Sequence, residues 1–244
     1  MRVARFFVDP PLETGARLAL PERAAHHAAR VLRLRVGDPL TLFDGRGGEY
    51  AATLVERTRE EISVEVGAWH EVEREAPLGI VLAQGISSAE RMDLTVQKAV
   101  ELGVAAIQPL DCEKSVVRLD ARRAESRRAH WQRVVVAACE QCGRNRLPEV
   151  RPPLRVSALC ESTPAAPAKW LLAPEAPTRL RDVAHAIGKG LVMAAGPEAG
   201  FSAAETRALL DAGYMPVRLG PRILRTETAA LAALAALNAI AGDG

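Results

Sequence analysis

Hydrophobic positions along the first seventy residues follow the short, alternating spacing of β-strands. The expected strands are residues 4–8, 39–44, 49–57 and 61–67, each bounded by turn residues. Residues 21–34 instead place Ala25, Ala28, Ala29 and Leu32 along one side of a helix. Residues 44–50, with three glycines, are typical of a hairpin turn. The pattern predicts a small β-barrel with one helix.

From residue 78 onward, short apolar strands alternate with longer helical stretches. The expected strands are residues 78–84, 104–110, 169–175, 190–196 and 215–220, and the expected helices follow Ser87, Ala121, Ser202 and Glu227. Ser87 and Ser202 each precede a glutamate by three residues, which is the pattern of a capping box. Repeated strand–helix units predict an α/β fold with a parallel sheet and helices on both faces.

A polar segment that ends in proline, residues 71–77, separates the two patterns. We therefore expect a first domain at residues 1–73 and a second at residues 74–244. The chain has 244 residues, of which 48% are hydrophobic and 25% charged, as in ordinary globular proteins. No apolar run approaches the roughly 20 residues that span a bilayer, and the start has no secretory signal. These features predict a cytoplasmic protein without a membrane partner.

The four cysteines include one C-x-x-C pair, Cys139 and Cys142, inside an expected helix. A zinc site needs a second pair or suitably spaced histidines, which are missing from the sequence, so we expect no metal. A redox pair usually begins a helix after a strand, so a structural or incidental role is favoured over redox chemistry.

Positive charge is concentrated in the middle of the chain. The net charge is only +2, yet residues 114–155 contain eleven Lys or Arg and four Asp or Glu, a local net of +7. Arginine, which contacts phosphate through two nitrogens at once, makes up 28 of the 32 basic residues. A coding bias explains that ratio but not the clustering, which indicates a polyanionic partner such as RNA.

Three expected strands end in loops rich in glycine and proline, at residues 174–175, 196–200 and 220–221. In open parallel sheets, ligands bind outside the carboxyl ends of the strands. Neither G-x-G-x-x-G nor a Walker lysine accompanies these loops, which disfavours an ordinary dinucleotide or ATP site. Leu219, Ile223 and Leu224 could instead sandwich an adenine ring. Plain turn chemistry is the alternative for each loop taken singly.

Several motifs resemble those of the RsmE-type RNA methyltransferases. These are QKAVELGV, ACEQCGRNRLPEV, GPEAGFS and LGPRILRTETA, together with HHAARVLRLRVGD and DGRGGEY near the amino terminus. The resemblance spans nearly the whole chain. It implies a PUA-like RNA-binding barrel at residues 1–73, followed by a SPOUT-class methyltransferase domain with a trefoil knot. It further implies methylation of uracil N3 at one uridine of small-subunit (16S) ribosomal RNA, S-adenosylmethionine as cofactor, and a homodimer.

The resemblance also implies a cofactor pocket built from the three loops. Its expected residues are Leu171, Leu172, Gly196, Pro197, Glu198, Gly200, Leu219, Gly220, Ile223, Leu224, Arg225, Thr226 and Ala229. The second loop departs from the family pattern G-P-E-G-G, because Ala199 stands where a glycine is usual. If that position requires a positive φ, alanine costs about 1 kcal/mol.

Uracil N3 is a poor nucleophile until it loses its proton. A cation near the uracil oxygens would stabilise the developing negative charge, and a carboxylate could accept the proton. Arg144 or Arg225 is the candidate cation, and Glu198 or Glu227 the candidate carboxylate. For Glu198, stabilisation of the helix that follows Ser202 is an equal alternative.

The candidate RNA-binding residues are Arg5, His26, Arg30, Arg33, Arg118, Arg144, Asn145 and Arg146. For the basic residues, a solvated loop or helix face is the alternative. Two other functions remain open: a SPOUT enzyme that methylates a ribose 2′-hydroxyl, and a ribosome-assembly RNA-binding protein without activity.

Overall fold

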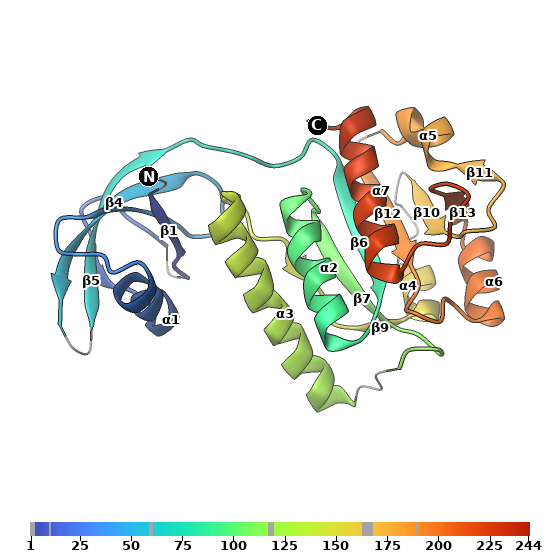
Figure 1. Cartoon of the computed structure of the whole chain (residues 1–244), viewed down its shortest axis with the longest axis horizontal. Helices are drawn as coiled ribbons and strands as arrows, with labels where there is room; N and C mark the ends of the chain where they lie inside the picture. The colour runs from blue at the N-terminus through green and yellow to red at the C-terminus, as the bar shows by residue number, and fades with distance from the viewer. Residues whose placement is uncertain (1–2, 10, 59–60, 117–119, 163–167, 189) are drawn as a thin grey trace. The chain divides into compact units, whose positions relative to one another are not determined.

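A computed structural model describes residues 3–244 except 10, 59–60, 117–119, 163–167 and 189. Contacts divide the chain into two compact units (Figure 1), namely Met1–Glu75 with Cys139–Leu147, and Ala76–Ala138 with Pro148–Gly244. The single domain boundary expected after residue 73 stays a prediction. The sequence did not indicate that Cys139–Leu147 would pack with the first unit.

The first unit contains strands β1 (Ala4–Phe7), β2 (Arg17–Ala19), β3 (Pro39–Phe43), β4 (Glu49–Arg57) and β5 (Ile62–His70). They form a sheet in the order β1-β3-β4-β5-β2, in which β1 is parallel to β3 and the other neighbours are antiparallel. The four predicted strands are confirmed. β2 is too short to show a pattern. Pairings among the described residues leave β1 and β2 at the edges, so a closed barrel stays a prediction.

The core of this sheet follows the two-residue period of the strands. Ala52 and Leu54 on β4, and Ile62, Val64 and Val66 on β5, are all buried, while their neighbours alternate toward solvent. They belong to one cluster with residues of β1, β3 and the first helix. Burial of this face stabilises the unit by roughly 25 cal/mol for each Å² of apolar surface.

The predicted hairpin turn joins β3 to β4, which pair antiparallel. Gly48 has a φ of +67°, and a Cβ on it would lie 2.4 Å from Nε1 of Trp69. Only glycine fits this position, both because of its left-handed backbone and because the indole ring lies against it.

The helix predicted at residues 21–34 has two parts, α1 (Glu22–His26) and a π-helical turn η1 (His27–Val31). Arg33 follows with a φ of +57°, and among the described residues it is the only non-glycine residue at positive φ. Such backbone strain and π-helical turns both occur preferentially at functional sites.

The second unit is built on a parallel sheet. Its strands are β6 (Gly79–Gly85), β7 (Ala106–Asp111), β8 (Glu149–Val150), β9 (Leu154–Arg155), β10 (Lys169–Leu172), β11 (Thr178–Arg179), β12 (Gly190–Ala195) and β13 (Met215–Arg218). The order is β11-β13-β10-β12-β6-β7-β8, with β9 beside β7, and the pairings are parallel. The predicted α/β fold with a parallel sheet is confirmed.

Helices accompany this sheet (Figure 1). They are α2 (Ala89–Glu101), α3 (Ala121–Cys142), α4 (Val156–Ser162), α5 (Leu180–Val183), η2 (Ala184–Ala186), α6 (Ala203–Asp211) and α7 (Thr226–Ala241). α4 and α6 share a buried cluster with alternate residues of β6 and β12. α2 packs against α7, which contacts β12. Within the described residues, no helix is both long and apolar enough to span a bilayer.

The two predicted capping boxes have different outcomes. Ser202 caps α6 as predicted, because its side chain accepts from the Glu205 N–H while the Glu205 carboxylate accepts from the Ser202 N–H. The box at Ser87 is wrong. Ser88 is the N-cap of α2, it makes no side-chain cap bond, and its own N–H donates to Glu198 from a distant loop. A tertiary contact thus replaces the local one.

Candidate functional site

A cavity of about 580 Å³ lies in the second unit, at the carboxyl ends of β10, β12 and β13. β10 lies between the other two strands, and its pairings with both are parallel, so the three loops that follow them meet at one edge of the sheet. This is the edge where open parallel sheets bind ligands. The volume is typical of sites for small ligands or cofactors.

The cavity gathers the residues that the sequence assigned to the cofactor pocket. Its wall includes Leu171, Leu172, Gly196, Pro197, Glu198, Gly200, Leu219, Gly220, Ile223, Leu224, Arg225, Thr226 and Ala229. Ile223 is 79% exposed, so its side chain stands at the open side of the site. The structure brings all thirteen residues together, while their binding role stays a prediction.

A buried polar link ties these segments to one another. Gln84, fully buried at the end of β6, donates from Nε2 to Oγ1 of Thr226 at 2.9 Å and to the Gly196 carbonyl at 3.4 Å. The Thr226 hydroxyl in turn donates to the Gly196 carbonyl at 2.5 Å. The loop after β12 is therefore joined to the start of α7 through two largely buried side chains, which favours a preformed cavity.

Glu198 holds the loop after β12 against the amino terminus of α2. The Ser88 N–H donates to Oε1 of Glu198 at 2.9 Å, and Nη1 of Arg91 lies 3.3 Å from the same oxygen. Burial raises the pKa of Glu198, but the bonds from Ser88 and the charge of Arg91 outweigh it, so the pKa lies below its usual value. A carboxylate held in this way is a weak base, and the helix that it stabilises is α2 rather than α6.

The Ala199 departure from the family pattern carries no backbone strain. Positive φ in this loop belongs to Gly200, at +69°, and Ala199 is not among the described residues with positive φ. Ala199 is exposed and lines the cavity, so its methyl group is a small addition to the wall.

Arg91, in the first turn of α2, is a cavity residue that sequence reasoning missed. It lies far from the three loops in the sequence, and no local signal marks it. Other lining residues that the sequence did not assign to the pocket are Ala173, Pro174, Ala195, Phe201, Thr206, Val217 and Arg218. Most of these residues lie on strands β12 and β13 or next to the three loops in the sequence, and this position could have identified them.

The structure separates the two candidate cations. Arg225 lines the cavity, is exposed, and is the N-cap residue of α7. Arg144 belongs to the first unit, is 4% exposed, and forms an ion pair with Glu75. Its guanidinium is thus engaged by a carboxylate of its own unit.

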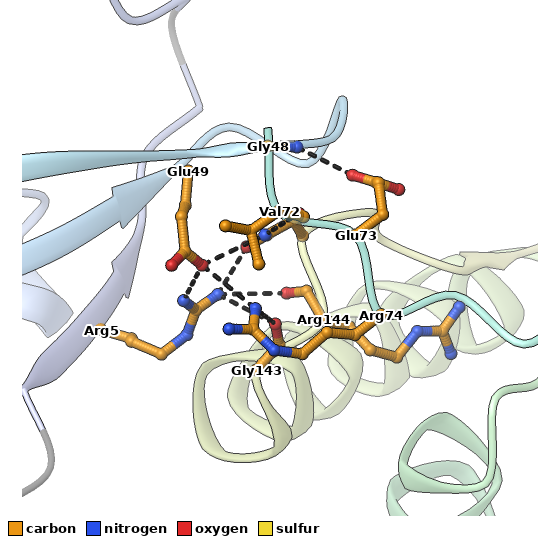
Figure 2. A network of polar contacts seen from close by, with 9 residues as sticks. Arg5, Gly48, Glu49, Val72, Glu73, Arg74, Gly143 and Arg144 are labelled. Atoms are coloured by element: carbon orange, nitrogen blue, oxygen red, sulfur yellow. Dashed lines mark hydrogen bonds and ion pairs between the residues drawn. The ribbon is translucent and has the colours of Figure 1, made fainter. Parts of the chain in front are cut away.

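A polar network in the first unit involves three of the candidate RNA-binding residues, Arg5, Arg144 and Asn145. Figure 2 shows Arg5 and Arg144 in this network. Arg5 forms an ion pair with Glu49 and donates to Oδ1 of Asn145 at 2.6 Å, and Asn145 donates to the Val72 carbonyl at 2.6 Å. Burial raises the pKa of Glu49, but hydrogen bonds from Arg5, Asn145 and Arg74 outweigh it and lower the pKa.

This network gives Arg5, Arg144 and Asn145 a structural role that the sequence did not reveal. They join residues 143–146 to β1, β4 and residues 72–75, and the side chains of Arg5 and Arg144 are only 7% and 5% exposed. Direct contact of these three residues with RNA stays a prediction, and it would require the network to open.

Other candidate RNA-binding residues lie at the surface. His26 on α1, Arg30 on η1 and Arg33 are exposed, and the Arg146 side chain is 56% exposed beside Glu73. Val31, Leu32 and Val36 are exposed next to them. Arg118 lies outside the described residues. The surface around η1 thus combines positive charge with exposed apolar side chains.

Cys139 and Cys142 lie on α3 as predicted, and both are free thiols. Burial raises the pKa of Cys139 to about 12, which makes it inert as a nucleophile. No group of three metal-binding side chains is found among the described residues.

Comparison with known proteins places these features in one family. Residues 74–238 match the family of the RNA methyltransferase domain, and residues 20–67 match the RNA methyltransferase PUA domain. Ribosomal RNA small subunit methyltransferase E of Buchnera aphidicola (Schizaphis graminum) is 32% identical over 99% of this chain and 98% of its own. The chain belongs to the ribosomal RNA small subunit methyltransferase E family.

Further relatives agree with this membership. The family member of Mycobacterium tuberculosis is 33% identical over 96% of this chain and 91% of its own. The crystal structure of the Neisseria gonorrhoeae member, bound to S-adenosyl methionine, is 39% identical, covers 99% of both chains and superimposes with a TM-score of 0.91. The resemblance inferred from the motifs is confirmed.

Proposed function

We propose that this protein transfers a methyl group from S-adenosylmethionine to N3 of a uridine in small-subunit (16S) ribosomal RNA. The observation that carries the proposal is the preformed cavity that three loops build in this chain. The Neisseria member of the same family was solved with S-adenosyl methionine bound. The relatives' names supply the ribosomal RNA substrate. The choice of uracil N3 rests on the motif resemblance.

The residues of the cavity fit this cofactor. Leu171, Leu172 and Leu224 offer apolar surface for an adenine ring. Gly200 and Gly220 have no heavy atom within 4 Å of the position where a Cβ would lie, so their backbone is open to a ligand. When bound, the cofactor supplies an electrophilic methyl group on a sulfonium.

The residues of the chain have three tasks in this reaction. The loop walls hold the base and the methyl group in line at about 3 Å. A cation stabilises the negative charge that develops on the uracil oxygens. A carboxylate or water accepts the N3 proton. The lowered pKa of Glu198 favours a structural role for this carboxylate. Glu227 is buried beside Arg91 and is not among the residues that line the cavity, so solvent is the favoured acceptor.

Four finer features belong to the same proposal. We infer that the segment after β13 is threaded as a SPOUT trefoil knot, supported by the bonds of Gln84 and Thr226 that hold it beside the loop after β12. We infer a homodimer, supported by the alanine-rich surface of α7, where Ala235 and Ala239 are exposed. Exposed Arg30, Arg33, Arg146 and His26 would contact the RNA, and this substrate places the activity in the cytoplasm.

The test uses the purified full chain, methyl-labelled cofactor, and small-subunit RNA both naked and in the assembled subunit. After digestion to nucleosides, the label should appear in 3-methyluridine. Label in a 2′-O-methyl nucleoside would show that the enzyme methylates a ribose 2′-hydroxyl and would overturn the proposal. Absence of binding heat with the cofactor would favour a binding protein without activity.

A matched pair of variants ties the activity to the cavity. Leu224→Arg places a charge in the cavity wall and should abolish cofactor binding. Leu210→Arg introduces the same side chain on α6, at a 39% exposed position outside the cavity wall, and should leave binding unchanged.

A further inference from the structure

The wall of the cavity carries more positive charge than the cofactor needs. Four arginines, Arg91, Arg218, Arg222 and Arg225, line it, against the single acid Glu198. S-adenosylmethionine has a sulfonium, an ammonium and a carboxylate, and therefore brings net positive charge itself. Surplus cations in the wall fit the other reactant, an anionic RNA and the oxygens of its target base.

Among these arginines, Arg91 is the one held in place by carboxylates within the described residues. Its Nη1 lies 3.3 Å from Oε1 of Glu198, and its Nε lies 4.0 Å from Oε1 of Glu227. Its side chain is still 40% exposed. Guanidinium has five N–H donors in a rigid plane, so donors remain for a ligand in the cavity.

Each of the two carboxylates also faces the positive end of a helix. Glu198 accepts from the Ser88 N–H at the start of α2, and Glu227 lies in the first turn of α7. Both helices are long enough, at 13 and 16 residues, to offset negative charge at their amino termini. The helix termini offset about half of each carboxylate charge, and the carboxylates orient Arg91 while its other N–H groups stay free to donate.

We propose that Arg91 is the cation that stabilises the deprotonated uracil, through its free N–H groups and the O2 or O4 oxygen of the target base. This inference rests on the proposed function. The N3–H bond gives its proton to a carboxylate or water. The electron pair on N3 then forms the bond to the methyl carbon as the carbon–sulfur bond breaks, leaving a neutral thioether.

Arg91 suits this role better than the two cations expected from the sequence. Arg144 is buried against Glu75 in the first unit. Arg225 is exposed on the loop after β13 and has no ion pair among the described residues, so its charge is not oriented in advance. Preorganised charge stabilises a transition state more than charge that must first be ordered.

The test compares Arg91→Met and Arg91→Lys with the wild-type chain and with Arg207→Met. Arg207 is an exposed arginine on α6 that pairs with Asp211 and lies outside the cavity wall, which makes it a matched control. Wild-type methylation of uracil N3 is measured first, so that failure of the proposed function is recognised separately.

We expect Arg91→Met to lower kcat by about 10²- to 10³-fold, as removal of one charge-stabilising donor does. Its rate should keep rising with pH beyond the point where the wild-type rate levels off, because the uracil must then ionise without help. RNA with 5-fluorouridine at the target position, which has a more acidic N3, should restore the variant more than the wild type. Arg91→Lys should show an intermediate rate.

The alternative is that Arg91 binds the carboxylate of the cofactor. This is tested by the affinities for S-adenosylhomocysteine and for 5′-methylthioadenosine, which lacks that carboxylate. If Arg91→Met weakens only the former and keeps the wild-type pH profile, Arg91 binds the cofactor and the proposal is wrong. A uniform loss of rate that 5-fluorouridine does not restore would also overturn it, as would wild-type kinetics in Arg91→Met.

Discussion

Thr226→Val removes the hydroxyl that joins α7 to the loop after β12, with little change in shape. In the wild type this hydroxyl donates to the Gly196 carbonyl at 2.5 Å and accepts from Nε2 of Gln84 at 2.9 Å. In the variant Gln84 keeps its bonds to the Gly85 and Gly196 carbonyls, at 3.1 and 3.4 Å. Two buried hydrogen bonds are therefore lost and no charge is exposed.

Each such bond contributes about 1 kcal/mol to the free energy of unfolding, so the loss is about 2 kcal/mol. For a chain of this size, 1 kcal/mol lowers the melting temperature by about 2–4 °C, which predicts a decrease of about 4–8 °C. Cofactor affinity should fall as well, because the Gly196 loop is no longer tied to α7.

Differential scanning calorimetry measures the first effect and titration with the cofactor the second. Thr226→Ser is the control, because it keeps the hydroxyl and loses one buried methyl group, worth about 0.8 kcal/mol. The reasoning is refuted if Thr226→Val melts within 1 °C of the wild type, or if Thr226→Ser is destabilised as much.

Three further predictions concern the first unit. Glu49→Gln should lower the free energy of unfolding at neutral pH. Because the folded pKa of Glu49 lies below its usual 4.5, the difference from the wild type should shrink as the pH falls below about 4.5. A difference that stays constant down to about pH 3 in urea unfolding would contradict this. Gly48→Ala should destabilise the unit by more than the roughly 1 kcal/mol of left-handed strain, since its Cβ would meet Trp69 at 2.4 Å. Gly15→Ala, at a φ of +87° with open space, isolates the strain alone, and equal losses of stability would exclude the clash. Arg30→Gln should weaken RNA binding and reduce the slope of log K against log salt by about 1 if Arg30 contacts a phosphate, and an unchanged slope would remove it from the interface.

The sequence predicted those features whose cause is local. Alternation of apolar residues placed the strands of the first unit, because the pleat repeats every two residues. Short continuous apolar runs placed the longer strands of the second unit, as is typical of parallel sheets. The Ser202 capping box was identified correctly because both of its partners lie within four residues. Glycine and proline at the ends of β10, β12 and β13 indicated the cavity, since strand ends in a parallel sheet meet at one edge.

Features that depend on distant partners were missed. Ser87 has the same local pattern as Ser202, yet α2 is capped by Glu198, which only the parallel arrangement of β6 and β12 brings to it. Arg144 and Asn145 were expected at a basic surface, but carboxylates and carbonyls of residues 49–75 hold them in the interior of the first unit. Charge counted along the chain does not reveal which charges are paired.

The sequence by itself therefore determined the α/β class, the longer strands, the loops that form the cavity and, through its motifs, the family. The tertiary structure decided which polar groups are buried together, and so assigned Glu198 to α2 and brought Arg91 to the cavity wall. The physical reason is the distance along the chain over which each kind of interaction acts. Propensity, capping and turn geometry act within a few residues, whereas ion pairs and buried hydrogen bonds depend on the positions of segments far apart in the chain.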